Sequence, residues 1–252
     1  MQKKKLFLTD FDGVLCDSVM ECLLVSYNAY HQLREPGTER LLDLGAISET
    51  QQREFRRLRA YLKGAEDFIP MYLSILQGQA IHSQQEFNAW HETLKPQLGE
   101  YTRAFYAERD FLMRHAKELW LRINPLFDDF AQILRERRSF DALHILTTKR
   151  REDVLETFSY HQIPFPAEQI TYIKAAGKSQ KLLDILRDQE VDVEHSVYCE
   201  DQVDFLIASQ QYGIGLYLVE WGYVSEEQRQ LAMQRDIPII STQQYAELLS
   251  AY

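Results

Sequence analysis

The chain contains little cysteine and no long apolar segment. Its 252 residues include three cysteines, Cys16, Cys22 and Cys199. An odd number at spacings unlike those of metal sites argues against a disulfide framework. No apolar run approaches the ~20 residues that a transmembrane helix requires, and MQKKK leads straight into a short apolar segment without the core of a signal peptide. We therefore expect a cytoplasmic protein with reduced thiols and no membrane partner.

Basic residues are also fewer than acidic residues. There are 28 Lys and Arg residues against 38 Asp and Glu residues, which gives a formal net charge of −10. Proteins that bind nucleic acid through its backbone must neutralise phosphates with basic side chains. The charge balance therefore argues against a nucleic-acid partner, while a small substrate in a locally positive pocket stays compatible with it.

Several common site motifs are missing. The sequence contains neither GxGxxG nor GxSxG, and none of its seven histidines forms an HxxxH pair. The segment AAGKS resembles the end of a phosphate-binding loop, but the first glycine of that motif would fall at Tyr172. These absences argue against a nucleoside-triphosphate cradle and against a zinc site.

The apolar pattern changes along the chain. Residues 5–9 are typical of a short buried strand, and residues 17–121 carry apolar residues every three or four positions, which predicts helices. From residue 124 onward, short apolar strands alternate with amphipathic helices. Strands are expected at 142–148, 169–174, 196–200, 214–220 and 237–240, and helices at 125–137, 151–162, 179–189, 202–213 and 242–250.

This alternation is typical of an α/β fold, a Rossmann-like parallel sheet with helices on both faces. We expect a core domain of residues 1–15 and 124–252, interrupted by an all-α domain of residues 16–123. Ligands of such sheets bind beyond the carboxyl ends of the strands. That rule places Asp10 and Asp12 in the binding crevice.

The segment LFLTDFDGVLCDS brings three carboxylates together where the first strand should end. Strand alternation puts Asp10 and Asp12 on the same side, and Gly13 permits a sharp turn. Two acids at a strand end suggest a hard divalent cation, with one acid available for covalent chemistry and the other for proton transfer. For Asp17 and Ser18, helix capping is an equally good interpretation.

The segment DFDGVLCDS resembles the first motif, DxDGxxxDS, of the phosphatases in the haloacid dehalogenase superfamily, with every fixed position filled. HILTTK is similar to the second motif, an apolar strand that ends in Thr or Ser. IKAAGKSQKLLDIL is similar to the third, a lysine near a helix start, and VYCEDQVDFLIA to the fourth, an acidic cluster. The four motifs occur in the order that the superfamily has.

The resemblance implies a role for each matched residue. Asp10 would attack phosphorus, Asp12 would protonate the leaving oxygen and then activate water, and Thr147 would donate to the phosphoryl oxygens. The motif-three lysine would neutralise charge; Lys178 is preferred because it follows a glycine just before the helix, with Lys174 and Lys181 as alternatives. Gly13 and Thr148 would contact substrate.

The resemblance also implies Mg²⁺ as cofactor. The candidate ligands are Asp10, Asp12 (through its backbone carbonyl), Glu200, Asp201 and Asp204. In the fourth motif Asp201 is preferred over Glu200, but the spacing leaves both open. The WGY segment at 221–223 resembles the corresponding ending in phosphoglycolate phosphatase-like members, and predicts loop packing near the site.

The function expected from this resemblance is hydrolysis of a small phosphorylated metabolite by a Mg²⁺-dependent phosphatase. The branch implied is that of phosphoglycolate phosphatase and β-phosphoglucomutase, in which a helical cap is inserted after the first motif. We expect a monomer or a homodimer. The second acid of the DxD motif favours phosphoester chemistry over dehalogenation, because a halide needs no proton. A phosphoryl-transferring sugar-phosphate mutase and a non-catalytic binding protein remain as alternatives.

Overall fold

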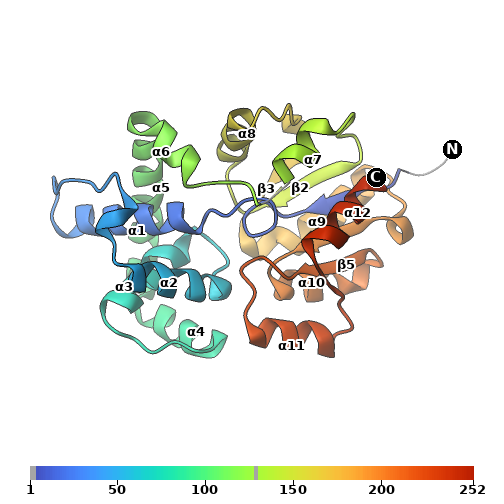
Figure 1. Ribbon diagram of the computed structural model, residues 1–252. Coiled ribbons are helices and arrows are strands. Elements are labelled where there is room, and N and C mark those ends of the chain that lie inside the picture. The colour runs from blue at the N-terminus through green and yellow to red at the C-terminus, as the bar shows by residue number, and fades with distance from the viewer. Residues whose placement is uncertain (1–3, 128–129) are drawn as a thin grey trace. The chain divides into compact units, whose positions relative to one another are not determined.

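The computed structural model of the protein describes residues 4–127 and 130–252 (Figure 1). The chain divides into two compact units. An α/β unit comprises Met1–Asp17 and Pro125–Tyr252, and a helical unit comprises Ser18–Asn124. Among the described residues, no helix combines the length and the apolar character needed to cross a membrane.

The α/β unit is built on a six-stranded sheet with strand order β3-β2-β1-β4-β5-β6, and every neighbouring pair is parallel. Its strands are β1 (Phe7–Thr9), β2 (Leu143–Thr147), β3 (Ile170–Tyr172), β4 (Val197–Glu200), β5 (Gly215–Val219) and β6 (Ile239–Ile240). The order reverses at β1, which lies between β2 and β4. The parallel α/β architecture predicted from the sequence is therefore confirmed, and the first motif follows the strand at the topological switch point.

In the described part of this unit, six helices accompany the sheet, and Figure 1 shows them packed around it. They are α7 (Phe130–Glu136), α8 (Arg151–Tyr160), α9 (Lys178–Asp188), α10 (Val203–Ser209), α11 (Glu226–Gln234) and α12 (Thr242–Ser250). Of the helix expected at 125–137, positions 128 and 129 lie outside the described residues. Helices α8, α9, α10 and α12 begin close to the positions that the sequence pattern indicates, whereas α11 was not expected from it.

Strand alternation divides the buried side chains between two cores. Phe7 of β1 packs with side chains of α7, α8 and α12, whereas Leu8 packs with side chains of α9, α10 and α11. Each β1 side chain is fully buried, because the strand is covered on both faces. A continuous apolar run therefore ends abruptly at the first acid of the motif, at the carboxyl edge of the sheet.

The helical unit contains α1 (Val19–Arg34), α2 (Glu49–Leu58), α3 (Phe68–Leu76), α4 (Gln84–Thr93), α5 (Leu98–His115) and α6 (Lys117–Arg122). Ser48 starts α2 with a capping box that Gln51 completes. By contrast, Ser18 at the start of α1 makes no side-chain capping bond. The capping interpretation of Ser18 therefore finds no support in its hydrogen bonds.

A buried ion pair joins two helices of this unit. Arg109 of α5 donates two hydrogen bonds of 2.8 Å to the carboxylate of Glu21 in α1. The indole of Trp120 in α6 donates a third, at 3.1 Å. Glu21 and Trp120 are fully buried, so these bonds satisfy a carboxylate that has no access to solvent.

Candidate active site

The turn after β1 is shaped by one carbonyl and one glycine. The Phe11 carbonyl accepts hydrogen bonds from the backbone N–H groups of Leu15 and Cys16, both at 2.9 Å. Gly13 has φ +84°, and a Cβ atom at this position would lie 2.0 Å from Asp201 Oδ2. Glycine is therefore required both for the backbone conformation and for the close approach of Asp201.

Asp10 follows β1 directly and is 6% exposed. Its Oδ2 lies 3.0 Å from Lys178 Nζ, while its Oδ1 is buried with no hydrogen-bond partner. Burial, and next the charge of Glu200, raise the pKa of Asp10 to about 7. The site therefore holds a carboxylate whose charge its surroundings do not fully balance.

Lys178 is the first residue of α9 and is fully buried between two acids. Its Nζ lies 2.7 Å from Glu200 Oε2 as well as 3.0 Å from Asp10 Oδ2. Burial alone would lower the pKa of Lys178, but the two carboxylates more than offset this and the pKa is raised. The ammonium group therefore stays charged, and it links the ends of β1 and β4.

Glu200, the last residue of β4, is fully buried. Besides Lys178, its Oε2 accepts a hydrogen bond of 2.5 Å from the Tyr198 hydroxyl. Its Oε1 accepts from the backbone N–H groups of Asp201 and Gln202, at 3.1 and 3.3 Å. Burial raises the pKa of Glu200, against the opposing effect of Lys178.

Three of the predicted acids converge. Carboxylate oxygens of Asp10, Glu200 and Asp201 lie within 4.8 Å of one another, and all three residues are buried. Lys178 provides a single positive charge against three acidic groups, and Asp10 Oδ1 has no donor. Oxygen donors with an excess of negative charge suit a hard divalent cation such as Mg²⁺, so the residues present fit the expected cofactor.

The loop after β5 holds Asp201 in place. The backbone N–H of Tyr223 donates to Asp201 Oδ2 at 3.1 Å. A Cβ atom at Gly222 would lie 2.4 Å from the Gly13 carbonyl oxygen, and the Trp221 indole donates to the Val14 carbonyl at 3.0 Å. The WGY segment therefore packs directly on the turn after β1, which is the loop packing predicted from its sequence.

Asp12 has a partner that the sequence analysis missed. Lys149 Nζ lies 3.1 Å from Asp12 Oδ1, and the lysine side chain is fully buried. The backbone N–H of Lys149 also donates to Thr147 Oγ1 at 3.1 Å, so this hydroxyl keeps its own proton to donate. The sequence does contain a signal for this contact, because Lys149 follows the threonine of the second motif by only two residues. A residue so close to the end of β2 stays at the carboxyl edge of the sheet, where Asp12 also lies.

The remaining residues predicted for the site are Thr148, Asp204 and the two alternative lysines. Thr148 is partly buried beside the threonine that ends β2. Asp204, in the first turn of α10, is exposed and is not part of the three-acid group found among the described residues. Of the alternative lysines, Lys174 is exposed and Lys181 is partly buried. The structure thus brings Lys178, rather than these two, to Asp10.

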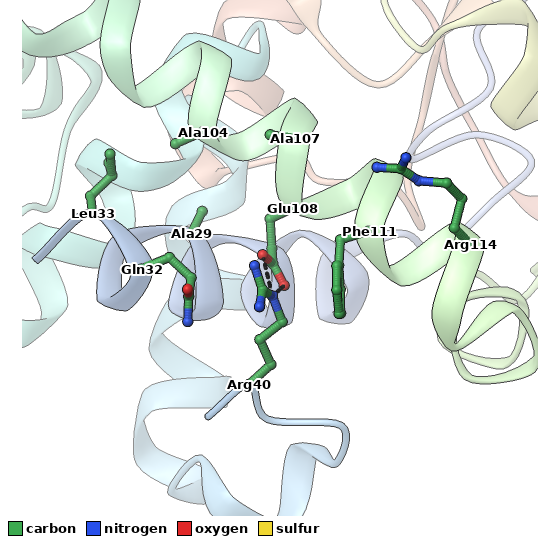
Figure 2. A pocket seen from close by; sticks show the side chains of 9 residues that line it. All are labelled: Ala29, Gln32, Leu33, Arg40, Ala104, Ala107, Glu108, Phe111 and Arg114. Carbon is green, nitrogen blue, oxygen red and sulfur yellow. Dashed lines mark hydrogen bonds and ion pairs between the residues drawn. The ribbon is translucent and has the colours of Figure 1, made fainter. Parts of the chain in front are cut away.

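The helical unit has a pocket of about 360 Å³ of its own, between α1 and α5. In Figure 2, the Arg40 side chain points toward the Glu108 carboxylate and lies beside Phe111. Arg40 Nε donates to both Glu108 oxygens, at 3.0 and 2.9 Å, and its guanidinium stands 3.9 Å from the Phe111 ring centre. None of the predicted site residues lines this pocket.

Two arginines of α2 form ion pairs within their own helix. Arg53 pairs with Glu49, and Arg57 pairs with Glu54 in the same helix. Ion pairs between residues three or four positions apart are typical of a solvated helix face.

Comparisons with known proteins support the fold. No family model matches the chain, and no curated protein sequence matches it. Solved structures do match over whole chains. A haloacid dehalogenase-like hydrolase from Streptococcus pneumoniae has a TM-score of 0.61 at 14% identity, with 100% of both chains covered.

Two further structures show the same similarity. A predicted phosphatase from Clostridium acetobutylicum has a TM-score of 0.56 at 12% identity, with 100% of both chains covered. A predicted phosphoglycolate phosphatase from Haemophilus somnus 129PT has a TM-score of 0.59 at 14% identity, with 100% of this chain and 99% of that chain covered. At such identities the likeness concerns the fold, which is that of haloacid dehalogenase-like hydrolases.

Proposed function

We propose that this protein is a Mg²⁺-dependent phosphatase of the haloacid dehalogenase superfamily, which hydrolyses a small phosphomonoester through an aspartyl-phosphate on Asp10. The observation that carries the proposal is the environment of Asp10. One of its oxygens pairs with Lys178, the other has no donor, and both residues are buried among acids at the carboxyl edge of the sheet. Perturbed ionisable groups gathered in this way are typical of active sites.

In the first half of the reaction, an Asp10 oxygen attacks phosphorus and the bond between phosphorus and the leaving oxygen breaks. Asp12 gives its proton to that oxygen, so that an alcohol departs. Lys178 and the Thr147 hydroxyl stabilise the charge on the phosphoryl oxygens. In the second half, Asp12 takes a proton from water, the water oxygen attacks phosphorus, and the bond to Asp10 breaks to release phosphate.

The cation would be held by Asp10, Asp201 and the backbone carbonyl of Asp12. When bound, Mg²⁺ would favour the ionised form of Asp10 and neutralise charge on the phosphoryl group. Glu200 belongs to the same acidic group, but its oxygens already accept four hydrogen bonds or ion-pair contacts. We therefore assign it to Lys178 rather than to the cation.

We also propose that the helical unit acts as a cap that contributes specificity. The chain leaves the α/β unit after Asp17 and returns at Pro125, where the Asp17 N–H donates to the Pro125 carbonyl at 2.8 Å. The insertion thus begins at the last residue of the first motif, the place from which a lid can exclude water from phosphoryl transfer.

The test is a panel of phosphorylated metabolites with released phosphate as readout, run with Mg²⁺ and with a chelator. Hydrolysis that requires Mg²⁺ and is lost in Lys178→Met, but kept in Lys174→Met, is the expected result. Lys174 is a matched control because it is exposed and lies only four residues away. A bisphosphate-activated isomerisation without phosphate release would instead identify a mutase. Absence of turnover across the panel would contradict the proposal.

A further inference from the structure

Tyr198 is a buried tyrosine next to the predicted site residues, and the proposed mechanism gives it no role. It lies in β4 two residues before Glu200, and strand alternation therefore puts both side chains on the same face. Its ring is 1% exposed and packs in the core that α9 and α10 cover. The ring contacts apolar side chains, and the hydroxyl donates a hydrogen bond of 2.5 Å to Glu200 Oε2.

This hydroxyl completes the hydrogen bonding of the Glu200 carboxylate. Lys178 and Tyr198 donate to Oε2, and the backbone N–H groups of Asp201 and Gln202 donate to Oε1. An ionised carboxylate has about four acceptor positions. All of them are occupied, so Glu200 is held on both edges and can turn only if a donor is lost.

Lys178 depends on this arrangement, since Glu200 is one of its two acidic partners. The Lys178 side chain is long and flexible, but its Nζ is fixed between Glu200 Oε2 at 2.7 Å and Asp10 Oδ2 at 3.0 Å. If the carboxylate of Glu200 rotated, the ammonium group would follow it and its distance from Asp10 would change. Small displacements of a charged group matter because electrostatic catalysis requires donors that are already in place.

We propose that Tyr198 is a positioning residue: its hydroxyl fixes the Glu200 carboxylate, which in turn holds Lys178 against Asp10. This inference rests on the proposed phosphatase function, because it assigns Lys178 and Asp10 their roles in phosphoryl transfer. The Tyr198 hydroxyl makes its hydrogen bond with Glu200 rather than with Asp10. The chain of contacts runs from the hydrophobic core through one carboxylate and one ammonium group to the nucleophile.

The test uses Tyr198→Phe, which removes one oxygen and keeps the buried ring. Tyr252→Phe is the matched control, because the Tyr252 hydroxyl donates to the His195 carbonyl at 2.7 Å, before the start of β4. With the best substrate of the panel, Tyr198→Phe should lower kcat by about 10-fold. KM and the Mg²⁺ concentration for half-maximal activity should stay as in the wild type, and Tyr252→Phe should match the wild type throughout.

A double-mutant cycle with Glu200→Gln separates positioning from a general structural effect. If Tyr198 acts through Glu200, Tyr198→Phe will lower kcat in the wild type but not in the Glu200→Gln background. Equal losses in both backgrounds would overturn the inference. A raised Mg²⁺ requirement in Tyr198→Phe would also overturn it, because Glu200 would then be serving the cation.

The two proposals fail in different ways. An active wild type whose Tyr198→Phe variant resembles Tyr252→Phe overturns the positioning role alone. A wild type that hydrolyses nothing in the panel overturns the proposed function, and the positioning role with it. Circular dichroism and thermal unfolding of each variant show whether a loss of kcat accompanies a loss of folded protein, which would also count against positioning.

Discussion

The Nζ atom of Lys149 lies 3.1 Å from Oδ1 of Asp12, and the two residues lie in the segments that follow strands β2 and β1. Lys149 is buried, and Asp12 is 15% exposed. The second acid of the DxD motif is thus held by a cation that belongs to neither the first nor the third motif. A proton donor is effective only when it is held within reach of the leaving group.

The first prediction follows from this contact. Lys149→Met should lower kcat on an alkyl phosphate by about 100-fold, the lower end of what acid–base catalysis contributes. The loss should be much smaller on an aryl phosphate with a good leaving group, which needs little protonation. Lys149→Arg, which keeps the charge, should restore part of the activity. Equal losses on both substrates would show that Lys149 does not act through Asp12.

The second prediction concerns the nucleophile. Asp10→Asn should abolish turnover, because the amide cannot form the aspartyl-phosphate. The folded state should not suffer, since burial already disfavours the charge of Asp10 and raises its pKa to about 7. Released phosphate measures the first effect and thermal unfolding the second. Turnover within about 10-fold of the wild type would exclude a covalent role, since nucleophile removal costs far more than this in comparable enzymes.

The third prediction separates the two acids of the fourth motif. Asp201→Asn should raise the Mg²⁺ concentration for half-maximal activity by at least about 10-fold. Glu200→Gln should leave that concentration unchanged but lower kcat, because its four contacts are with protein donors. Calorimetric titration of Mg²⁺ into each variant provides a readout independent of activity. The reverse pattern would mean that Glu200 is the ligand.

The fourth prediction is a pH dependence of stability in the α/β unit. Burial lowers the pKa of His144 to about 4, in β2, where its Nε2 lies 2.8 Å from Thr171 Oγ1. Below its ordinary pKa of about 6.5 the unfolded chain binds a proton that the folded protein does not bind. Stability is therefore full above about pH 6.5 and falls toward pH 4, by on the order of 3 kcal/mol.

Denaturant unfolding of the wild type and of His144→Asn at a series of pH values checks this expectation. The variant should lose this part of the pH dependence, whereas the contribution of the carboxylates stays in both proteins. Parallel curves for the two proteins between pH 7 and pH 4 would show that His144 is not responsible.

The fifth prediction concerns the buried ion pair of the helical unit. Arg109→Met should cost about 3–5 kcal/mol, because it leaves Glu21 buried without its cation. Arg53→Met is the matched control, since its pair with Glu49 in α2 is exposed and contributes little. Urea unfolding followed by tryptophan fluorescence measures both. A cost for Arg109→Met no larger than for the control would contradict the assigned contact.

Much of the fold could be predicted from sequence because its signals are local. Apolar runs of strand length that alternate with amphipathic segments specify a parallel sheet, and the burial of β1 on both faces is already visible in KLFLT. The positions of the acids follow in turn, because the carboxyl ends of parallel strands share one edge. The DxDG motif forms a local turn, in which Gly13 adopts a positive φ that glycine tolerates best.

Only the tertiary structure determines which side chains meet when they follow strands that are distant in sequence. The sequence favoured Lys178 among three lysines near the start of α9 but left Lys174 and Lys181 open, and the packing of that helix on the sheet brings Lys178 to Asp10. Glu200 ends β4 and Asp201 follows it, and the two adjacent acids have different partners. One turns to Lys178 and the other to the Tyr223 N–H. Such choices depend on distances across the sheet, which no periodicity along the chain encodes.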